Sequence, residues 1–215
     1  AFYQQGHFDA AAQLAMDILA TDKNRIETLL TLANALRELG QFDDALKVLR
    51  RIAQLDPNHR GAHAAYALTL FYKEDWPRAW RAFDVRFKLM DKPPEVKSRG
   101  ADGGSVALKP WRGGALPPTL LVMGEQGLGD TIQFARFLPL LTAAGVKVTC
   151  VVQQRLFKLI GTLDAAIDLR PLETSGTVKG IKAWTPMMHL PQALNLEPSQ
   201  FAPHVPYLHA EPERV

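Results

Sequence analysis

The first ninety residues repeat with a period of 34 residues, and this feature constrains the fold more than any other. A shift of 34 places Gly6 on Gly40, and a second shift places Gly40 on Glu74. A fixed period of this length is typical of a repeat array, in which each unit buries its apolar face only against its neighbours. Other columns pair aromatic, small or apolar residues: Phe8, Phe42 and Trp76; Ala11, Ala45 and Ala79; Ala15, Leu49 and Phe83.

A turn glycine, an aromatic residue after it and small residues at a helix crossing resemble the tetratricopeptide repeat, whose unit is two antiparallel helices. The resemblance implies an α-solenoid of about two and a half units over residues 1–90. Pro57 ends the second unit, because proline cannot continue a helix. Glu74 in place of glycine predicts an altered turn in the third unit. Because only residues 1–5 precede Gly6, we expect the chain to be a fragment with further repeats upstream.

The concave face of such an array is the expected site for a protein or peptide partner. Its expected contact residues are Asn34 and Arg37 on one helix and Tyr72 on the next. In the family that the repeats resemble, clamps for acidic peptide C-termini use a lysine and an asparagine one turn apart. Here Leu30 stands in the place of the lysine, so that specialised ligand is not expected.

Residues 91–118 are rich in proline and glycine and show no helical periodicity, which indicates a linker. Trp111 lies in this segment. Because an indole left in water forfeits a large apolar burial, we expect Trp111 to dock on a domain surface.

Residues 119–215 change to the pattern of a parallel sheet. Short apolar runs alternate with stretches of helical spacing in the order strand, helix, strand, helix, strand. This order predicts right-handed crossovers and a Rossmann-like half-domain, so the fold class expected for the chain is α plus α/β. The less regular remainder is expected to add one or two edge strands. The expected segments are 119–124, 131–145, 146–152, 153–163 and 165–170.

A glycine-rich loop follows the first of these strands. Gly124, Gly127 and Gly129 allow backbone N–H groups to approach a ligand at the start of a helix, where an anion is favoured. We expect the loop to be tight, with positive φ angles, so that Gly127→Val damages the protein more than Gly161→Val. The loop lacks the spacing of the dinucleotide fingerprint and the lysine of a P-loop, so neither NAD nor ATP is expected.

The longer string GEQGLGDTIQFARFLPLLTAAG, together with VVQ, MMHLPQALN and VPYL, resembles bacterial proteins that join tetratricopeptide repeats to a heptosyltransferase-like GT-B glycosyltransferase domain. The resemblance implies that residues 119–215 are the N-terminal, acceptor-side half of that domain. It implies no cofactor, and a nucleotide-sugar donor that binds only with the missing C-terminal half. It also implies that Asp130, in the Gly129-Asp130 pair, is a catalytic base. The chain departs from heptosyltransferases in the preceding Glu125-Gln126.

Each candidate residue also has a structural interpretation. Asp130 can cap the helix, with Gln133 three residues on, and a carboxylate held by backbone N–H groups is a poorer base. Glu125 is equally a ligand residue or a loop ion-pair partner. Arg136 can reach a phosphate or an acidic sugar, or pair with a surface carboxylate. The expected substrate-binding residues are Glu125, Gln126, Gly127, Gly129, Gln133 and Arg136.

Composition excludes other classes of function. The net charge of +3 is spread along the chain and does not favour nucleic acid. There is no apolar run long enough for a membrane span and no secretory signal pattern. Cys150 is the only cysteine and lies in an apolar run, which indicates a buried thiol and a cytoplasmic location. His59 and His63 have helical ligand spacing, but without a third ligand no metal site is expected.

Two functions follow from these observations. The first is a fragment of a glycosyltransferase, inactive alone, whose repeats recruit a glycan or protein acceptor. The second is a non-catalytic scaffold whose repeats bind a partner protein or another copy of the chain.

Overall fold

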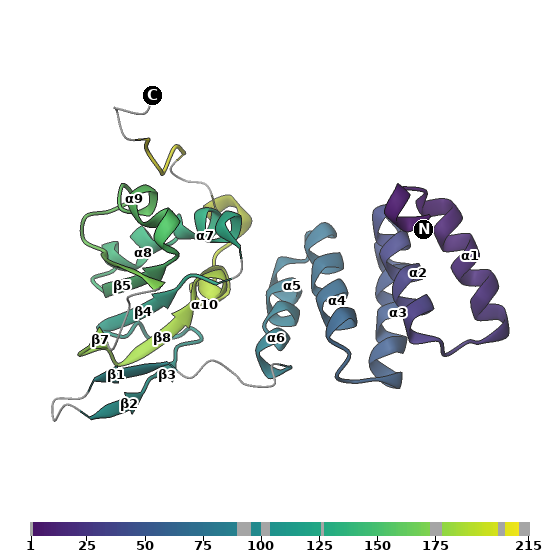
Figure 1. Cartoon of the computed structure of the whole chain (residues 1–215), viewed down its shortest axis with the longest axis horizontal. Coiled ribbons are helices and arrows are strands. Elements are labelled where there is room, and N and C mark those ends of the chain that lie inside the picture. Colours follow the sequence, from purple (N-terminus) through teal and green to yellow (C-terminus); the bar gives the residue numbers. More distant parts are fainter. Residues whose placement is uncertain are drawn as a thin grey trace. The chain divides into compact units, whose positions relative to one another are not determined.

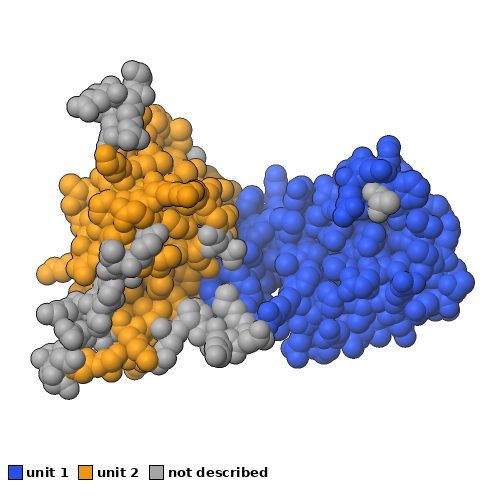
Figure 2. All heavy atoms as spheres, viewed as in Figure 1, with its two compact units in different colours: residues 1–93 blue, residues 94–215 orange. Residues whose placement is uncertain are grey.

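A computed structural model describes residues 2–89, 96–99, 104–125, 127–172, 178–201 and 205–210. The chain divides into two compact units, residues 1–93 and 94–215, which are coloured separately in Figure 2. The predicted fold class is confirmed, because a helical repeat region is followed by a sheet of parallel strands (Figure 1). In the described residues no helix is long and apolar enough to cross a membrane.

The helices of the first unit follow the sequence period. Three of them begin at Phe8, Phe42 and Trp76, which are spaced by 34 residues. Alanines 33 and 45 are fully buried, so the helices pack closely around small side chains. The elements of this unit are η1 (Tyr3–Gln5), α1 (Phe8–Thr21), α2 (Ile26–Glu38), α3 (Phe42–Leu55), α4 (Arg60–Tyr72), α5 (Trp76–Phe83) and α6 (Val85–Lys88).

The turn at Glu74 keeps the conformation of the glycine turns. The φ angles of Gly6, Gly40 and Glu74 are 79°, 74° and 61°, all in the left-handed region. The expectation of an altered turn is therefore wrong. Glu74 adopts this conformation at a cost of about 1–2 kcal/mol, because its Cβ crowds the backbone there, and the surrounding repeat maintains it.

The main sheet of the second unit has the strand order β3-β8-β4-β5-β6, and all its strands are parallel. The predicted succession of strand, helix, strand, helix and strand is confirmed by β4, β5 and β6 and the helices between them. The elements are β3 (Lys109–Pro110), β4 (Thr119–Met123), α7 (Leu128–Ala135), α8 (Leu138–Ala143), β5 (Lys147–Val152), η2 (Gln154–Leu156), α9 (Phe157–Ile160), β6 (Asp168–Pro171), β8 (Ala183–Pro186), η4 (Met187–His189), α10 (Leu190–Ala193) and η5 (Pro198–Gln200).

Two details of this unit differ from the sequence-based expectation. The helix expected over 131–145 is two helices, α7 and α8, and Pro139 lies in the first turn of the second, where its missing N–H is tolerated. Strand β8 is interior, between β3 and β4, whereas an edge position was expected. Trp184 and Thr185 of β8 are both buried, which agrees with an interior strand.

The described residues of the expected linker belong to the second unit and contribute strands to it. A second, three-stranded sheet has the order β2-β1-β7, with β1 antiparallel to β2 and parallel to β7. Strand β3 adds an edge to the main sheet. The strands of the small sheet are β1 (Lys97–Arg99), β2 (Ser105–Ala107) and β7 (Val178–Lys179).

Trp111 fixes the end of this segment to the main sheet. Its backbone N–H donates to the carbonyl of Trp184 at 2.7 Å, and its indole N–H donates to the carbonyl of Ala115 at 3.2 Å. The side chain is only 8% exposed. Both N–H groups of Trp111 therefore have hydrogen-bond acceptors in its buried position.

The glycine pair after Trp111 offers a matched test of backbone strain. Gly113 has φ 114°, and a Cβ there would lie 2.9 Å from the carbonyl oxygen of Ala193. Gly114 has φ 81°, with no atom within 4 Å of the added Cβ. We expect Gly113→Ala to destabilise the second unit by about 3 kcal/mol and Gly114→Ala by about 1 kcal/mol. Urea unfolding of both variants measures the difference, and equal losses would show that the contact with Ala193 is unimportant.

Cys150 provides a reporter for the second unit alone. It is the single cysteine of the chain, lies in β5 and is fully buried, as predicted. Burial raises the pKa of its thiol well above the ordinary range, because the thiolate would be desolvated. We expect Ellman's reagent to modify the native protein at least about 1,000-fold more slowly than the urea-unfolded protein. Rapid modification without denaturant would contradict the buried position of β5.

Candidate functional site

The glycine loop lies at the carboxyl edge of the parallel sheet, where ligands bind in open α/β folds. Strand β4 ends at Met123, and Gly124 extends its pairing with β5 by donating from its N–H to the carbonyl of Val151 at 2.7 Å. Helix α7 then begins at Leu128. The ends of β5 and β8 meet the same edge, because both strands are parallel to β4.

The glycines of this loop do not have the backbone conformation that we expected. The φ angles of Gly124, Gly127 and Gly129 all lie outside the positive region, and that of Gly127 is −83°. A Cβ on Gly127 would meet only the Asp130 carboxylate, at 3.3 Å, whereas one on Gly161 would lie 3.1 Å from the carbonyl of Phe157. On steric grounds Gly161 is thus the more restricted position, which reverses the expected order of the two valine substitutions.

Asp130 caps the helix, but from a different position than the sequence suggested. Helix α7 starts earlier than expected, so Gly127 is the N-cap and Asp130 is the third helical residue. The N–H of Gly127 donates to Oδ2 of Asp130 at 3.0 Å. Gln133 is exposed and is not the partner in this capping arrangement. Asp130 is half-buried, and within the described part of the chain no hydrogen bond to its Oδ1 is found.

Glu125 connects the loop to the segment after β8. Its Oε1 accepts a hydrogen bond from the backbone N–H of Met188 at 3.3 Å. The sheet edge therefore carries two half-buried carboxylates, from Glu125 and Asp130. Gln126, the neighbouring candidate, lies outside the described residues.

Thr131 and Gln153 belong to the same site, although the sequence analysis did not select them. The Thr131 hydroxyl is buried, lies 3.0 Å from Oε1 of Gln153 and 3.3 Å from the carbonyl of Gly127, and can donate to one of them at a time. The pair joins α7 to the end of β5. Gln153 directly follows β5, and this position at the ligand-binding edge was the signal that could have identified it.

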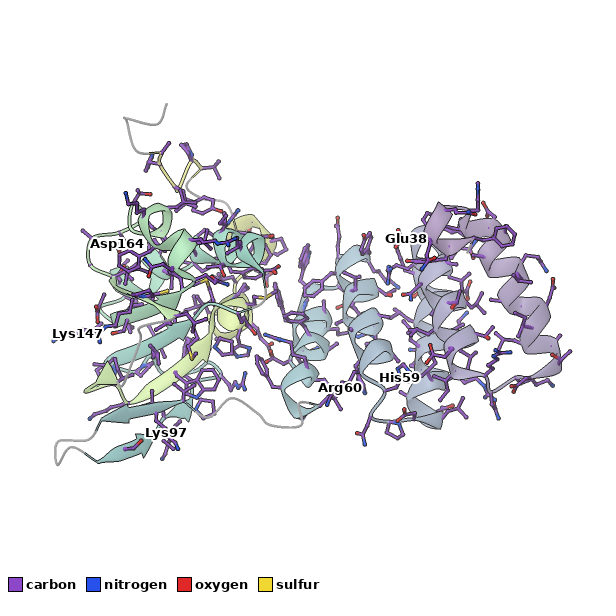
Figure 3. All side chains as sticks on the ribbon, viewed as in Figure 1. Glu38, His59, Arg60, Lys97, Lys147 and Asp164 are labelled. Carbon is purple, nitrogen blue, oxygen red and sulfur yellow. The ribbon has the colours of Figure 1, made fainter. Side chains whose placement is uncertain are left out.

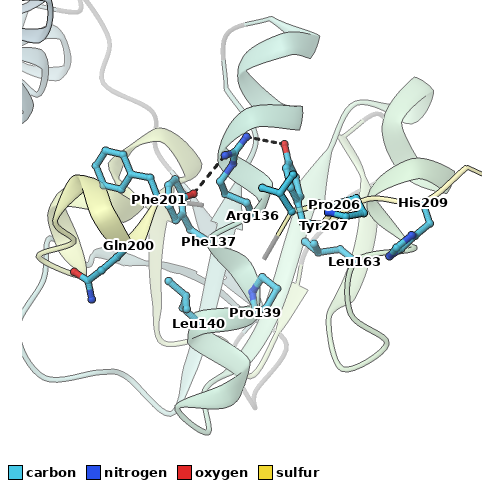
Figure 4. Close-up of a pocket in the computed structure, with 11 residues that line it drawn as sticks. Arg136, Phe137, Pro139, Leu140, Leu163, Gln200, Phe201, Pro206, Tyr207 and His209 are labelled. Atoms are coloured by element: carbon cyan, nitrogen blue, oxygen red, sulfur yellow. Dashed lines mark hydrogen bonds between the residues drawn. The ribbon is translucent and has the colours of Figure 1, made fainter. Parts of the chain in front are cut away.

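Arg136 is engaged by residues near the C-terminal end of the described chain (Figure 4). Its guanidinium donates to the carbonyl of Phe201 at 3.3 Å and to the hydroxyl of Tyr207 at 3.1 Å. It also lies 4.5 Å from the centre of the Tyr207 ring. These residues line a pocket of about 270 Å³ to which the described residues of the 124–130 loop contribute no side chain. The structure therefore does not bring Arg136 together with the other candidate residues at the sheet edge.

Asp164 offers a contrast to Asp130 within the same unit (labelled in Figure 3). It precedes β6 and thus lies toward the opposite, amino-terminal edge of the sheet. The Thr142 hydroxyl and the N–H of Ala166 donate to its carboxylate at 2.6 and 2.9 Å. These hydrogen bonds lower the pKa of Asp164 by stabilising the charged form.

The three residues expected to bind a partner lie together in the first unit. Arg37 donates to Oδ1 of Asn34 at 2.9 Å, and its guanidinium carbon lies 5.7 Å from the centre of the Tyr72 ring. Arg37 also pairs with Glu38 at 2.8 Å and is only 7% exposed. The guanidinium therefore links neighbouring helices, while the Tyr72 side chain, which is 53% exposed, faces solvent.

The two histidines near the start of α4 contact backbone groups. Nδ1 of His59 accepts from the N–H of Ala62 at 3.1 Å and caps the helix. Nε2 of His63 lies 2.7 Å from the carbonyl of Pro57. Among the residues that the structure describes, no group of three histidine, cysteine or acidic residues is placed to hold a metal ion.

Comparison with known proteins bears mainly on the first unit. MamA AMB-1 is similar at 24% identity and a TM-score of 0.39, over 41% of this chain and 52% of that structure. A mutant of Thermobaculum terrenum O-GlcNAc transferase is similar at 18% identity and a TM-score of 0.36, over 77% of this chain and 31% of that structure. The chain thus spans less than two thirds of either protein. No curated protein matches it. The tetratricopeptide repeat family profile matches residues 2–69, so this part of the chain consists of tetratricopeptide repeats.

Proposed function

We propose that the second unit is the acceptor-side half of a glycosyltransferase and that Asp130 is its general base. The observation that carries this proposal is the placement of Asp130 at the carboxyl edge of the parallel sheet. One carboxylate oxygen is held by the N–H of Gly127, and the other is available to an acceptor hydroxyl. The cap thus orients the carboxylate without occupying it fully.

The chemistry would be a single displacement at the sugar. The acceptor hydroxyl oxygen forms a bond to the anomeric carbon, and the bond from that carbon to the nucleotide phosphate oxygen breaks with its electron pair. Asp130 takes the hydroxyl proton. Thr131 and Gln153 hold the loop against the end of β5 and so fix the position of the base. In this proposal the nucleotide-sugar donor is held by a second Rossmann-like half outside these 215 residues, and the repeats recruit the glycan or protein acceptor.

Transfer assays with the longer protein that contains this chain test the proposal. Incubation with a panel of sugar nucleotides should give donor hydrolysis or transfer. Asp130→Ala should lower turnover by about 100- to 10,000-fold, the usual range for loss of a general base. Asp164→Ala is the matched control, because it also removes a hydrogen-bonded carboxylate of this unit but at the other sheet edge. Equal turnover in wild type and Asp130→Ala would remove Asp130 from catalysis.

A non-catalytic scaffold is the second candidate function. It is favoured by the exposed apolar side chains of Leu68 and Tyr72, one turn apart on α4. Tetratricopeptide repeats present such faces to proteins or peptides. If the scaffold proposal is correct, no sugar nucleotide is consumed, and Tyr72→Ala weakens recovery of the protein's partner while Asp130→Ala leaves it unchanged.

A further inference from the structure

A groove of about 640 Å³ lies in the first unit, apart from the residues considered so far. Side chains of α1, α2 and α3, which follow one another in Figure 1, line it. Its apolar part includes Leu32 and Leu36 of α2, Leu39 directly after that helix, and Met16 of α1. Two carboxylates flank these leucines, Asp9 from α1 and Asp44 from α3. We call this hollow the first groove.

The 34-residue period provides an internal comparison for the first groove. One repeat later, Asp43 on α3 is equivalent to Asp9, and Lys73, directly after α4, stands in the place of Leu39. Lys73 forms an ion pair with Asp43 and thereby joins α4 to α3. The hydrogen bond from Lys73 within this ion pair lowers the pKa of Asp43. In the first groove Leu39 cannot make the equivalent ion pair, and no ion pair of Asp9 is found among the described residues.

A second pair of equivalent positions shows the same difference. Tyr66 stands in the place of Leu32, and Arg78 in the place of Asp44. Arg78 donates to the Tyr66 hydroxyl at 3.2 Å, so this contact joins α5 to α4. In the later repeat, long aromatic and cationic side chains thus connect the helices. In the first groove these positions carry Leu32, which is buried, and Asp44, so the cationic contact is missing and negative charge remains beside the apolar lining.

We propose that the first groove binds a cationic amphipathic segment of a partner protein. Its apolar side chains would cover Leu36, Leu39 and the exposed Met16, and a lysine or arginine would pair with Asp9 as Lys73 pairs with Asp43. Asp44 already pairs with Lys47 at 2.8 Å, but both side chains are mostly exposed, and such an ion pair contributes little. The lysine of the ligand would thus take the role that Lys73 has beside Asp43 one repeat later.

Fluorescence anisotropy with the full chain tests this proposal. The probe is a short labelled peptide with leucine and tryptophan on one helical face and lysine on the other, and the matched control peptide carries glutamate in place of lysine. Asp9→Asn should weaken binding of the lysine peptide by about fivefold or more, because it removes one charge of the complementary pair. Asp43→Asn is the matched control at the equivalent position and should leave the affinity unchanged, because Lys73 already pairs with Asp43.

Leu39→Lys gives a second, independent readout. The substitution introduces a lysine that can pair with Asp9. The fold already accepts lysine at the equivalent position of the next repeat, Lys73. Circular dichroism should show native helicity, while peptide affinity falls by about tenfold or more. The proposal fails if the lysine peptide does not bind at concentrations up to about 1 mM. It also fails if the glutamate peptide binds equally well, or if Asp9→Asn and Leu39→Lys both bind like wild type.

Discussion

Replacing Trp111 with alanine is expected to destabilise the second unit by about 3–5 kcal/mol. The indole is almost completely buried, and its loss leaves a large cavity next to β8 and an unpaired carbonyl on Ala115. Such a loss approaches the whole stability of a small domain. The rate of Cys150 modification measures this loss, because the single thiol of the chain lies in β5 of the second unit.

Two further variants separate the causes of this loss. Trp111→Phe keeps most of the apolar volume and removes the hydrogen bond to Ala115, so a smaller loss of about 1–2 kcal/mol is expected. Leu116→Ala changes a neighbouring side chain that is 41% exposed, and no more than about 1 kcal/mol should be lost. If Trp111→Ala were as mild as Leu116→Ala, the segment before β4 would not be anchored to the sheet.

The repeat region could be predicted from the sequence because similar residue types recur every 34 residues. Phe8, Phe42 and Trp76 were assigned to the turns by their equal spacing, and each proves to be the first residue of a helix. The turn at Glu74 was misjudged because propensity favours glycine at positive φ, and the packing of the repeat overrides that preference.

The order of β4, β5 and β6 was also accessible, because apolar runs separated by helical spacing leave few alternatives. The strands before β4 were not. They are two or three residues long and lie among prolines and glycines, so no periodicity can reveal them. The interior position of β8 depends on pairing with both β3 and β4, which is a long-range contact without a local signature.

At the candidate site, the sequence identified the edge but not its contacts. Glu125 was selected from its position after β4, and Asp130 from the resemblance of the Gly129-Asp130 pair to heptosyltransferases. The contact between Thr131 and Gln153 joins residues 22 apart, and the contacts of Arg136 with Phe201 and Tyr207 span more than sixty. Such partners depend on the tertiary fold, so the sequence alone could not identify the contacts of Arg136.

The central claim is that Asp130 serves as a base in addition to capping α7, and Asp130→Asn separates these two roles. The asparagine side-chain oxygen can still accept the hydrogen bond from Gly127, but the neutral amide cannot take a proton at the acceptor hydroxyl. The stability of the second unit should therefore change by no more than about 1 kcal/mol.

The decisive measurement is the turnover of sugar nucleotide by Asp130→Asn in the longer protein, compared with Asp164→Asn at matched stability. The account predicts a loss of about 100- to 10,000-fold for Asp130→Asn with the fold intact, and full turnover for Asp164→Asn. Unchanged turnover in Asp130→Asn would contradict the account and leave Asp130 as a helix cap alone.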